Sequence, residues 1–299
     1  MSTITTISKG GLSAKIDSMG AQLTSLSFDG HEYLWQADPR WWGRSAPVLF
    51  PIVGSLRNNE AVSAAGPCKL GRHGIARLYE HRLVRLADDG ASVTYELTES
   101  PETLEAFPYQ FKLNMTYAVL GEATFTQTFA VTNTGDADLP FSVGGHPAFN
   151  VPAPGGAELD EAFEDYELVF TKPWSCKTPD LTADGLMDWK NAYYAIKDAD
   201  VMPISRSTFD HDTVMFTDVP DHTVMLRGTK SGHGVQVDFP DFKFLGLWSA
   251  ANDAPFVALE PWTGHASCTD EDGVFEHKDN TIVLGPGETD VRSFSITLF

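Results

Sequence analysis

The sequence predicts an all-β fold, and two observations support this prediction. Short apolar segments recur along the 299 residues, and clusters of Gly, Pro, Asn and Asp separate them. Such spacing is typical of antiparallel strands joined by tight turns. No linker, repeat or low-complexity segment divides the chain, and all-β folds reach this length as one unit. We therefore expect one domain over residues 1–299.

The N-terminal part of the chain predicts a β meander. The sequence LTSLSF, ending at Phe28, is typical of a half-buried strand. Asp29-Gly30 follows it and is typical of a hairpin turn. The expected strands of this meander cover residues 4–7, 12–16, 21–28 and 31–35.

The rest of the chain continues the same pattern. The segment PETLEA, residues 101–106, is the one short helical turn that we expect, and Phe107-Pro108 ends it. Residues 172–200 show no clear alternation, so we expect them to be irregular. The further expected strands cover residues 92–97, 111–120, 123–132, 166–170, 214–216, 223–227, 234–239, 244–248, 257–260, 281–283 and 291–298.

Composition and charge exclude several classes of partner. The formal net charge is −20 and the sequence pI is about 4.6, so the chain should repel nucleic acid and anionic membrane surfaces. The three cysteines are far apart and form no CxxC pair, which argues against a disulfide scaffold or a thiolate zinc site. The N-terminus lacks the pattern of a signal peptide. We expect a cytoplasmic protein with reduced thiols.

The common cofactor and nucleophile motifs are absent. The sequence has no GxGxxG after a strand, no Walker loop, no HExxH and no GxSxG. In the segment Asp210-His211-Asp212, alternation would send the histidine to the opposite side from the two carboxylates, which weakens a shared metal centre. We expect no cofactor and no metal site.

The segment FSVGGHPAFN, residues 141–150, presents the first candidate catalytic residue, His146. Two glycines precede it, and glycine adopts conformations that other residues avoid. Pro147 fixes its own φ and pushes His146 toward an extended conformation. A histidine whose direction is controlled in this way suits an acid or base catalyst.

Glu260 is the second candidate, as the last residue of the apolar strand VALE before Pro261. Burying a carboxylate at a strand end is costly unless it is paired or functional. Desolvation should raise its pKa, which suits a general base. The alternative is a structural ion pair with an arginine.

Four further residues are candidates for binding a substrate. Arg57 follows a buried aromatic and proline-rich segment and offers several donors in a fixed fork. His73 lies in a loop between two glycines, and Asp212 stands just before a strand. Trp248 adds an aromatic face. Together with His146 and Glu260, these groups could bind a neutral sugar, whose hydroxyls take hydrogen bonds and whose C–H face lies on an indole.

At these residues the sequence resembles the aldose 1-epimerases, or galactose mutarotases, and most closely their LacX-like branch. The resemblance rests on SLRNN, GRHGIAR, GGHPAFN and LEPWTG and runs from GAQLTSL to LGPGE near the C-terminus. It implies a β-supersandwich and the interconversion of α and β anomers of a free aldose without a cofactor.

The resemblance also implies the role of each residue. Glu260 matches the catalytic base and His146 the catalytic acid, with Glu260 charged and His146 cationic at the start. Arg57 and His73 match substrate-binding positions, and Asp212 matches one less closely. We expect a small-molecule sugar as partner and a monomer or homodimer as the assembly.

Three rival interpretations stay open. Arg57, Arg72 and Arg77 could hold the phosphate of a hexose 6-phosphate in a related epimerase. The chain could also be a carbohydrate-binding module that has lost catalysis. A metal enzyme using several histidines ranks last, because His73, His146, His211 and His222 lack a tight ligand spacing.

Overall fold

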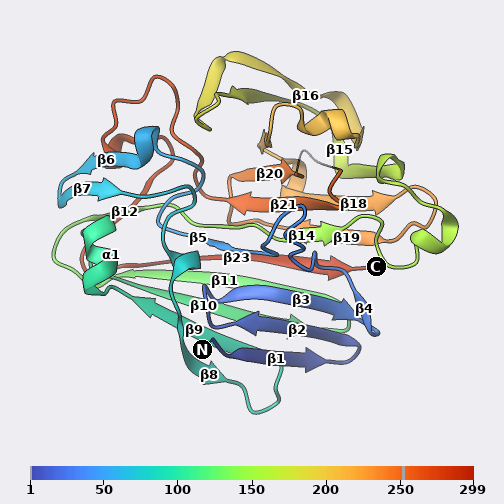
Figure 1. The fold of residues 1–299 in the computed structure, drawn as a ribbon, viewed down its shortest axis with the longest axis horizontal. Coiled ribbons are helices and arrows are strands. Elements are labelled where there is room, and N and C mark those ends of the chain that lie inside the picture. Colours follow the sequence, from blue (N-terminus) through green and yellow to red (C-terminus); the bar gives the residue numbers. More distant parts are fainter. Residues whose placement is uncertain (1, 251–252) are drawn as a thin grey trace.

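Antiparallel sheets make up most of the molecule, which confirms the all-β prediction (Figure 1). The computed structural model describes residues 2–250 and 253–299. The predicted helical turn is present as α1, Pro101–Ala106, where the side chain of Ser100 accepts from the backbone of Thr103. Short 3₁₀ turns span Arg57–Asn59, Ala76–Leu78, Ala157–Leu159, Phe163–Asp165, Arg206–Phe209, Pro220–His222 and Phe275–His277. Within the described ranges, no helix has the length and apolar character needed to cross a bilayer.

A nine-stranded sheet runs through the whole molecule in the order β16-β15-β18-β19-β23-β11-β10-β9-β8. Its central strands bury every second side chain, as the burial of β10 shows, because one face packs against the core. The strands are β8 Arg82–Leu86, β9 Ser92–Thr98, β10 Phe111–Leu120, β11 Thr124–Asn133, β15 Tyr166–Leu181, β16 Met187–Pro203, β18 Thr223–Gly228, β19 Gly234–Asp238 and β23 Thr289–Leu298.

Two smaller sheets contribute to the same core. The predicted N-terminal meander is present as β1 Ile4–Lys9, β2 Leu12–Asp17, β3 Gln22–Phe28 and β4 His31–Glu32. The second sheet has six strands: β5 Val48–Leu49, β13 Gly144–Gly145, β14 Ala148–Asn150, β17 Val214–Thr217, β20 Phe244–Trp248 and β21 Phe256–Trp262. Two strand pairs complete the fold: β6 Glu60–Ser63 with β7 Gly66–Lys69, and β12 Leu139–Phe141 with β22 Ile282–Leu284.

The six-stranded sheet separates the core from the candidate site. In β21, Val257 and Leu259 belong to the large hydrophobic core that also holds side chains of the nine-stranded sheet. The alternate residues Ala258, Glu260 and Trp262 face the other side, because side chains in a strand alternate between its two faces. One face of this sheet is therefore structural, and the other is available for binding.

The expectation of irregular structure over residues 172–200 was wrong. These residues form most of a long hairpin, β15 with β16, at the top of Figure 1. Four register shifts interrupt the pairing, and many side chains of β16 are exposed. A strand with bulges and little burial does not alternate between apolar and polar residues, so its sequence gives no period-two signal.

The two glycines before His146 are needed for close packing against neighbouring rings rather than for unusual backbone angles. Neither Gly144 nor Gly145 has a positive φ. A Cβ at Gly145 would lie 2.7 Å from the ring of Phe294, which is buried in the core. A Cβ at Gly144 would lie 2.7 Å from the indole of Trp262. Glycine is required here because neighbouring rings approach the backbone closely.

We expect Gly145→Ala to lower the free energy of unfolding by about 1–3 kcal/mol, because the buried Phe294 ring must shift to admit the new methyl group. Urea unfolding followed by tryptophan fluorescence measures this loss. Gly71→Ala is the matched control, since a Cβ at Gly71 meets no atom within 4 Å. Equal stability of the two variants would contradict the packing explanation.

Candidate active site

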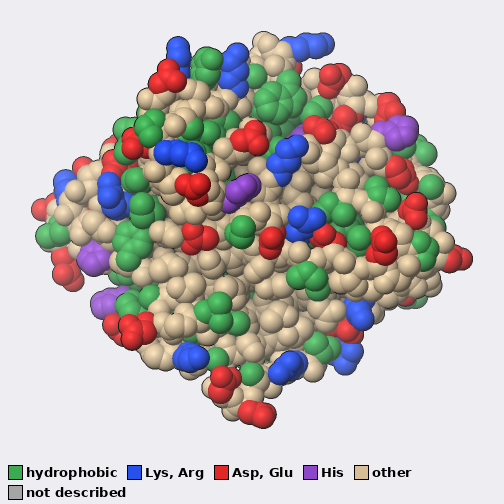
Figure 2. Space-filling view, turned by 180° about the vertical axis from the view of Figure 1, so that it is seen from behind, with side chains coloured by type: hydrophobic (Ala, Val, Ile, Leu, Met, Phe, Trp, Pro, Cys, Tyr) green, Lys and Arg blue, Asp and Glu red, His purple; other side chains and the backbone are tan. Residues whose placement is uncertain are grey.

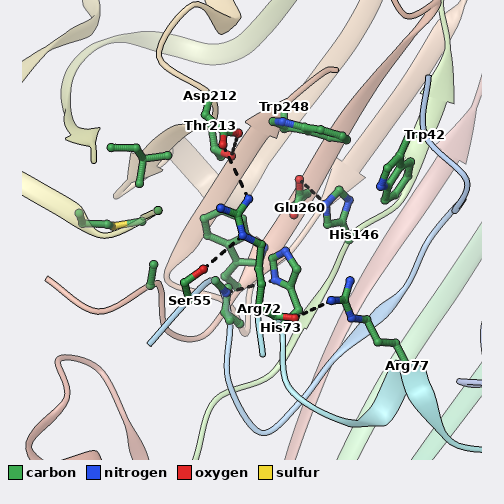
Figure 3. A pocket seen from close by; sticks show the side chains of 17 residues that line it. Trp42, Ser55, Arg72, His73, Arg77, His146, Asp212, Thr213, Trp248 and Glu260 are labelled. Carbon is green, nitrogen blue, oxygen red and sulfur yellow. Dashed lines mark hydrogen bonds and ion pairs between the residues drawn. The ribbon is translucent and has the colours of Figure 1, made fainter. Parts of the chain in front are cut away.

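A cavity opens on the free face of the six-stranded sheet (Figure 3). It holds about 720 Å³ of empty space with its mouth included, a volume typical of small-molecule sites. Five of the six predicted site residues line it: His73, His146, Asp212, Trp248 and Glu260. Only Arg57 lies elsewhere.

His146 and Glu260 face each other across the floor of the cavity. Gly144 of β13 lies opposite Trp262 of β21. Two residues after Gly144 and two residues before Trp262, the same register places His146 opposite Glu260. The Nε2 atom of His146 lies 3.3 Å from Oε1 of Glu260. The predicted histidine and glutamate therefore form a pair, and the alternative of an ion pair between Glu260 and an arginine is not what the structure shows.

Burial controls the protonation of this pair. Glu260 is 1% exposed and His146 is 7% exposed. Removal from water raises the pKa of Glu260 well above its usual value, and Asp212 raises it further. Removal from water likewise lowers the pKa of His146, and the arginines Arg72 and Arg77 add to this effect.

These shifts bear on which residue of the pair carries the proton before a substrate binds. We expected a charged Glu260 beside a cationic His146, but burial favours a neutral carboxyl beside a neutral imidazole. Both arrangements contain one proton in total, and they differ only in which residue carries it. The pair is therefore best described as two groups that share one proton.

His73 is held as a neutral donor. It lies in a turn with φ of +67°, and Gly74 follows with φ of +70°. The backbone N–H of Gly54 donates to Nδ1 of His73 at 3.1 Å. Because Nδ1 accepts, the proton of the neutral ring is on Nε2. Burial lowers the pKa of His73 well below its usual value, so the ring stays neutral and offers one N–H.

Arg72 spans the cavity between two walls. Its Nε donates to the hydroxyl of Ser55 at 3.2 Å, and its guanidinium lies 3.7 Å from the carboxylate of Asp212. Asp212 has a φ of +67°, which fits its position in the tight turn before β17. The tip of the β15–β16 hairpin comes so close that a Cβ at Gly185 would lie 2.6 Å from the Arg72 guanidinium.

Arg77 adds a second guanidinium to the cavity wall. It donates to the backbone carbonyl of Arg72 at 2.6 Å, and its buried Nε has no hydrogen-bond partner among the described residues. Burial, with repulsion from Arg44 and Arg72, lowers the pKa of Arg77 to about 10. The cavity is therefore locally positive in a chain of net charge −20, whose acidic side chains are spread over the face shown in Figure 2.

Aromatic rings form the remaining wall. The ring of Trp248 meets the His146 ring edge to face, with their centroids 5.5 Å apart. Trp42 lies almost parallel to the His146 ring, at 4.8 Å and 24°. Figure 3 shows both indoles on the side of the cavity nearest His146.

The structure does not bring Arg57 to this cavity. Its guanidinium donates to the backbone carbonyls of Cys268 and Thr269, and it borders two other surface hollows instead. The segment after Ser55 turns away from the cavity through a 3₁₀ turn, in which Asn58 has a positive φ. Arg72 and Arg77, which the sequence suggested only as phosphate ligands, are the arginines that line the cavity.

Sequence reasoning missed several lining residues. Ser55 and Trp262 lie within the motifs SLRNN and LEPWTG, but nothing in their spacing indicated a role. Trp42 carried a possible signal, since the Trp41-Trp42 pair stands in a polar loop. The hairpin residues Leu181 and Met187 lie in the segment that we expected to be irregular.

The metal interpretation gains no support from side-chain positions. His211 pairs with Asp180 at 2.9 Å, and His222 contacts the backbone carbonyl of Phe242. Within residues 2–250 and 253–299, no three His, Cys, Asp or Glu side chains lie close enough together to hold an ion.

Comparisons with known proteins identify the class to which this fold and cavity belong. A sequence profile described as aldose 1-epimerase matches residues 2–281. The chain is 38% identical over 295 residues to the plasmid and chromosomal forms of protein LacX from Lactococcus lactis subsp. lactis, with 96% of each chain covered. This chain belongs to the aldose 1-epimerase family, as the motifs indicated.

Solved structures agree with this assignment. A galactose mutarotase related enzyme from Lactobacillus acidophilus is similar with a TM-score of 0.92 and 32% identity, covering 99% of this chain and 97% of that one. A galactose mutarotase-like protein from Lactobacillus casei has a TM-score of 0.88 and 25% identity, with coverage of 99% and 100%.

We expect histidine-selective ¹⁵N NMR to show His73 as a neutral ring protonated on Nε2 between about pH 5 and 8, because burial opposes its charge. His277 is the matched control. It is exposed, and its partner Asp272 raises its pKa, so it should titrate in this range. An imidazolium signal for His73 near pH 7 would contradict the assignment.

Proposed function

We propose that this protein is an aldose 1-epimerase that interconverts the α and β anomers of a free hexose. The observation that carries the proposal is the pair of His146 and Glu260, buried and 3.3 Å apart on the floor of a cavity with donors and indoles in its walls. Membership in the aldose 1-epimerase family supports the same reaction class.

Ring opening needs one base and one acid. Glu260 takes the proton from the anomeric hydroxyl, and His146 gives a proton to the ring oxygen. The bond between C1 and the ring oxygen breaks as the C1 carbonyl forms. The open-chain aldehyde rotates about C1–C2, and the same two groups reverse their roles to close the ring on the other face.

The proton count of the pair fits this cycle. The pair begins with the proton on His146 and ends ring opening with it on Glu260. The second arrangement is the one that burial favours. No proton enters or leaves over the full cycle, so the site needs no exchange with solvent during turnover. One such group typically contributes about 10²–10⁴-fold.

The other lining residues support binding and orientation. The Nε2–H of His73 can donate to a sugar oxygen, since Gly54 occupies the other ring nitrogen. Asp212 and Arg72 offer an acceptor and donors at the opposite wall. The face of Trp248 suits the C–H surface of a pyranose. These roles stay proposals together with those of the catalytic pair.

A second candidate function is epimerisation of a hexose 6-phosphate. Two arginines line the cavity and a third, Arg44, lies close enough to lower the pKa of Arg77. Guanidinium groups bind phosphate well, so these arginines favour a phosphorylated sugar although the net charge of the chain is −20.

We expect polarimetry on fresh α-D-glucose and α-D-galactose to show faster approach to anomeric equilibrium with wild type than with Glu260→Gln, whose kcat should fall by about 10²–10⁴-fold. Far-UV circular dichroism controls for folding of the variant. Glucose 6-phosphate forms the third arm and decides between the two candidate functions. A wild type that is silent on all three sugars would favour a carbohydrate-binding module without catalysis.

We expect kcat/KM to follow a bell-shaped pH profile, because only the one-proton form of the pair holds both an acid and a base. A second proton at low pH removes the base, and loss of the only proton at high pH removes the acid. Both apparent pKa values belong to the pair rather than to one residue. A flat profile over about pH 5–8, after subtraction of the uncatalysed rate, would contradict the assignment of His146 and Glu260 as acid and base.

A further inference from the structure

The loop between β4 and β5 places Trp42 directly against His146. The two rings stack with centroids 4.8 Å apart and an interplanar angle of 24°. The backbone of Trp42 is fixed on both sides of the residue. Its N–H donates to the carbonyl of Asp38 at 3.0 Å, and its carbonyl accepts from the indole N–H of Trp35 at 2.9 Å. These two bonds fix the backbone from which the Trp42 ring extends toward His146.

The imidazole of His146 is held mainly by rings. Trp248 meets it edge to face at 5.5 Å, and His73 does so at 5.6 Å. Nδ1 of His146 is buried and has no hydrogen-bond partner in the described part of the chain. A histidine catalyst is commonly oriented through a hydrogen bond from its second nitrogen. At this site the stacked indole takes the place of that bond.

The indole also acts on the charge of His146. The face of an aromatic ring is electrostatically negative, so it attracts a cation placed over it. Among the charged and titratable groups around His146, the carboxylate of Glu260 attracts the positive charge of an imidazolium. His73, Arg72 and Arg77 oppose a positive charge on that ring. Burial opposes it as well. Trp42 and Glu260 therefore both stabilise the imidazolium form of His146.

We propose that Trp42 is a positioning residue that orients the imidazole of His146 and shifts the shared proton of the His146–Glu260 pair toward His146. The inference deepens the proposed function, because the form with the proton on His146 is the one that starts ring opening. Trp42 itself need not touch the reacting atoms, and it acts through the ring on which it stacks.

The test compares Trp42→Leu, Trp42→Phe and the matched control Trp41→Leu. Trp41 is the preceding residue in the loop, meets Trp35 edge to face instead, and does not line the cavity. We expect Trp42→Leu to lower kcat by about tenfold, the size of a partly desolvated cation–π contact, with KM changed much less. Trp42→Phe should recover most of the activity, and Trp41→Leu should resemble wild type.

The pH profile separates the proposed role from simple packing. Without the indole the imidazolium is less stable, so the acidic limb of kcat/KM should move to lower pH in Trp42→Leu. If the indole only excluded water, its removal would hydrate His146 and move that limb to higher pH. A shift to higher pH, an unmoved limb, or an equal loss in Trp41→Leu would overturn the proposal.

A direct titration keeps the inference testable if no sugar is turned over. Histidine-selective NMR of the His146 ring should give a lower pKa in Trp42→Leu than in wild type and an intermediate or unchanged value in Trp42→Phe. An unchanged pKa in Trp42→Leu would defeat the inference whatever the activity. Failure of wild type on all sugars with the expected NMR shift would defeat only the proposed function.

Discussion

The site depends on one constraint, the removal from water of a carboxyl and an imidazole that face each other across a strand ladder. In water each would take its ordinary charge, but burial makes each charge costly, and proximity lets one proton serve both. The fold maintains this state through β21, whose Val257 and Leu259 anchor the strand in the core while Glu260 points the other way. A shift of one residue in register would bury the carboxyl in the hydrophobic core.

The walls of the cavity come from distant parts of the chain. The loop with Trp42 precedes β5, the turn with His73 follows β7, and the β15–β16 hairpin brings Gly185 against Arg72. Each wall is attached to a paired strand, which fixes the backbone behind its donors and rings. Such preorganisation suits the proposed reaction, in which the protein moves protons but forms no bond to the substrate.

Much of this arrangement could be predicted from local sequence. His146 before Pro147 and Glu260 at the end of an apolar run carry signals that need no knowledge of the fold. Arg57 shows the limit, because only the turn at Asn58 reveals that its side chain leaves the cavity. The hairpin over residues 172–200 escaped prediction because bulges and exposure remove the alternation on which strand prediction relies. The contact between Trp42 and His146 joins segments about a hundred positions apart, which no local pattern reports.

The β15–β16 hairpin overhangs the cavity but does not carry His146 or Glu260, so its sequence can change without altering that pair. Its tip reaches Arg72, and the hairpin joins the body of the protein near the site through a bridge between Met187 and Cys268 and through a hydrogen bond from Met215 to Thr178. His146 and Glu260, the proposed acid and base, lie by contrast on the six-stranded sheet. Insertions or exchanges in the hairpin can therefore reshape what enters the cavity while the proton-transfer pair stays as it is. For the proposed reaction, the chemistry and the choice of sugar thus depend on separate segments, and the hairpin is the segment to exchange when a new specificity is sought.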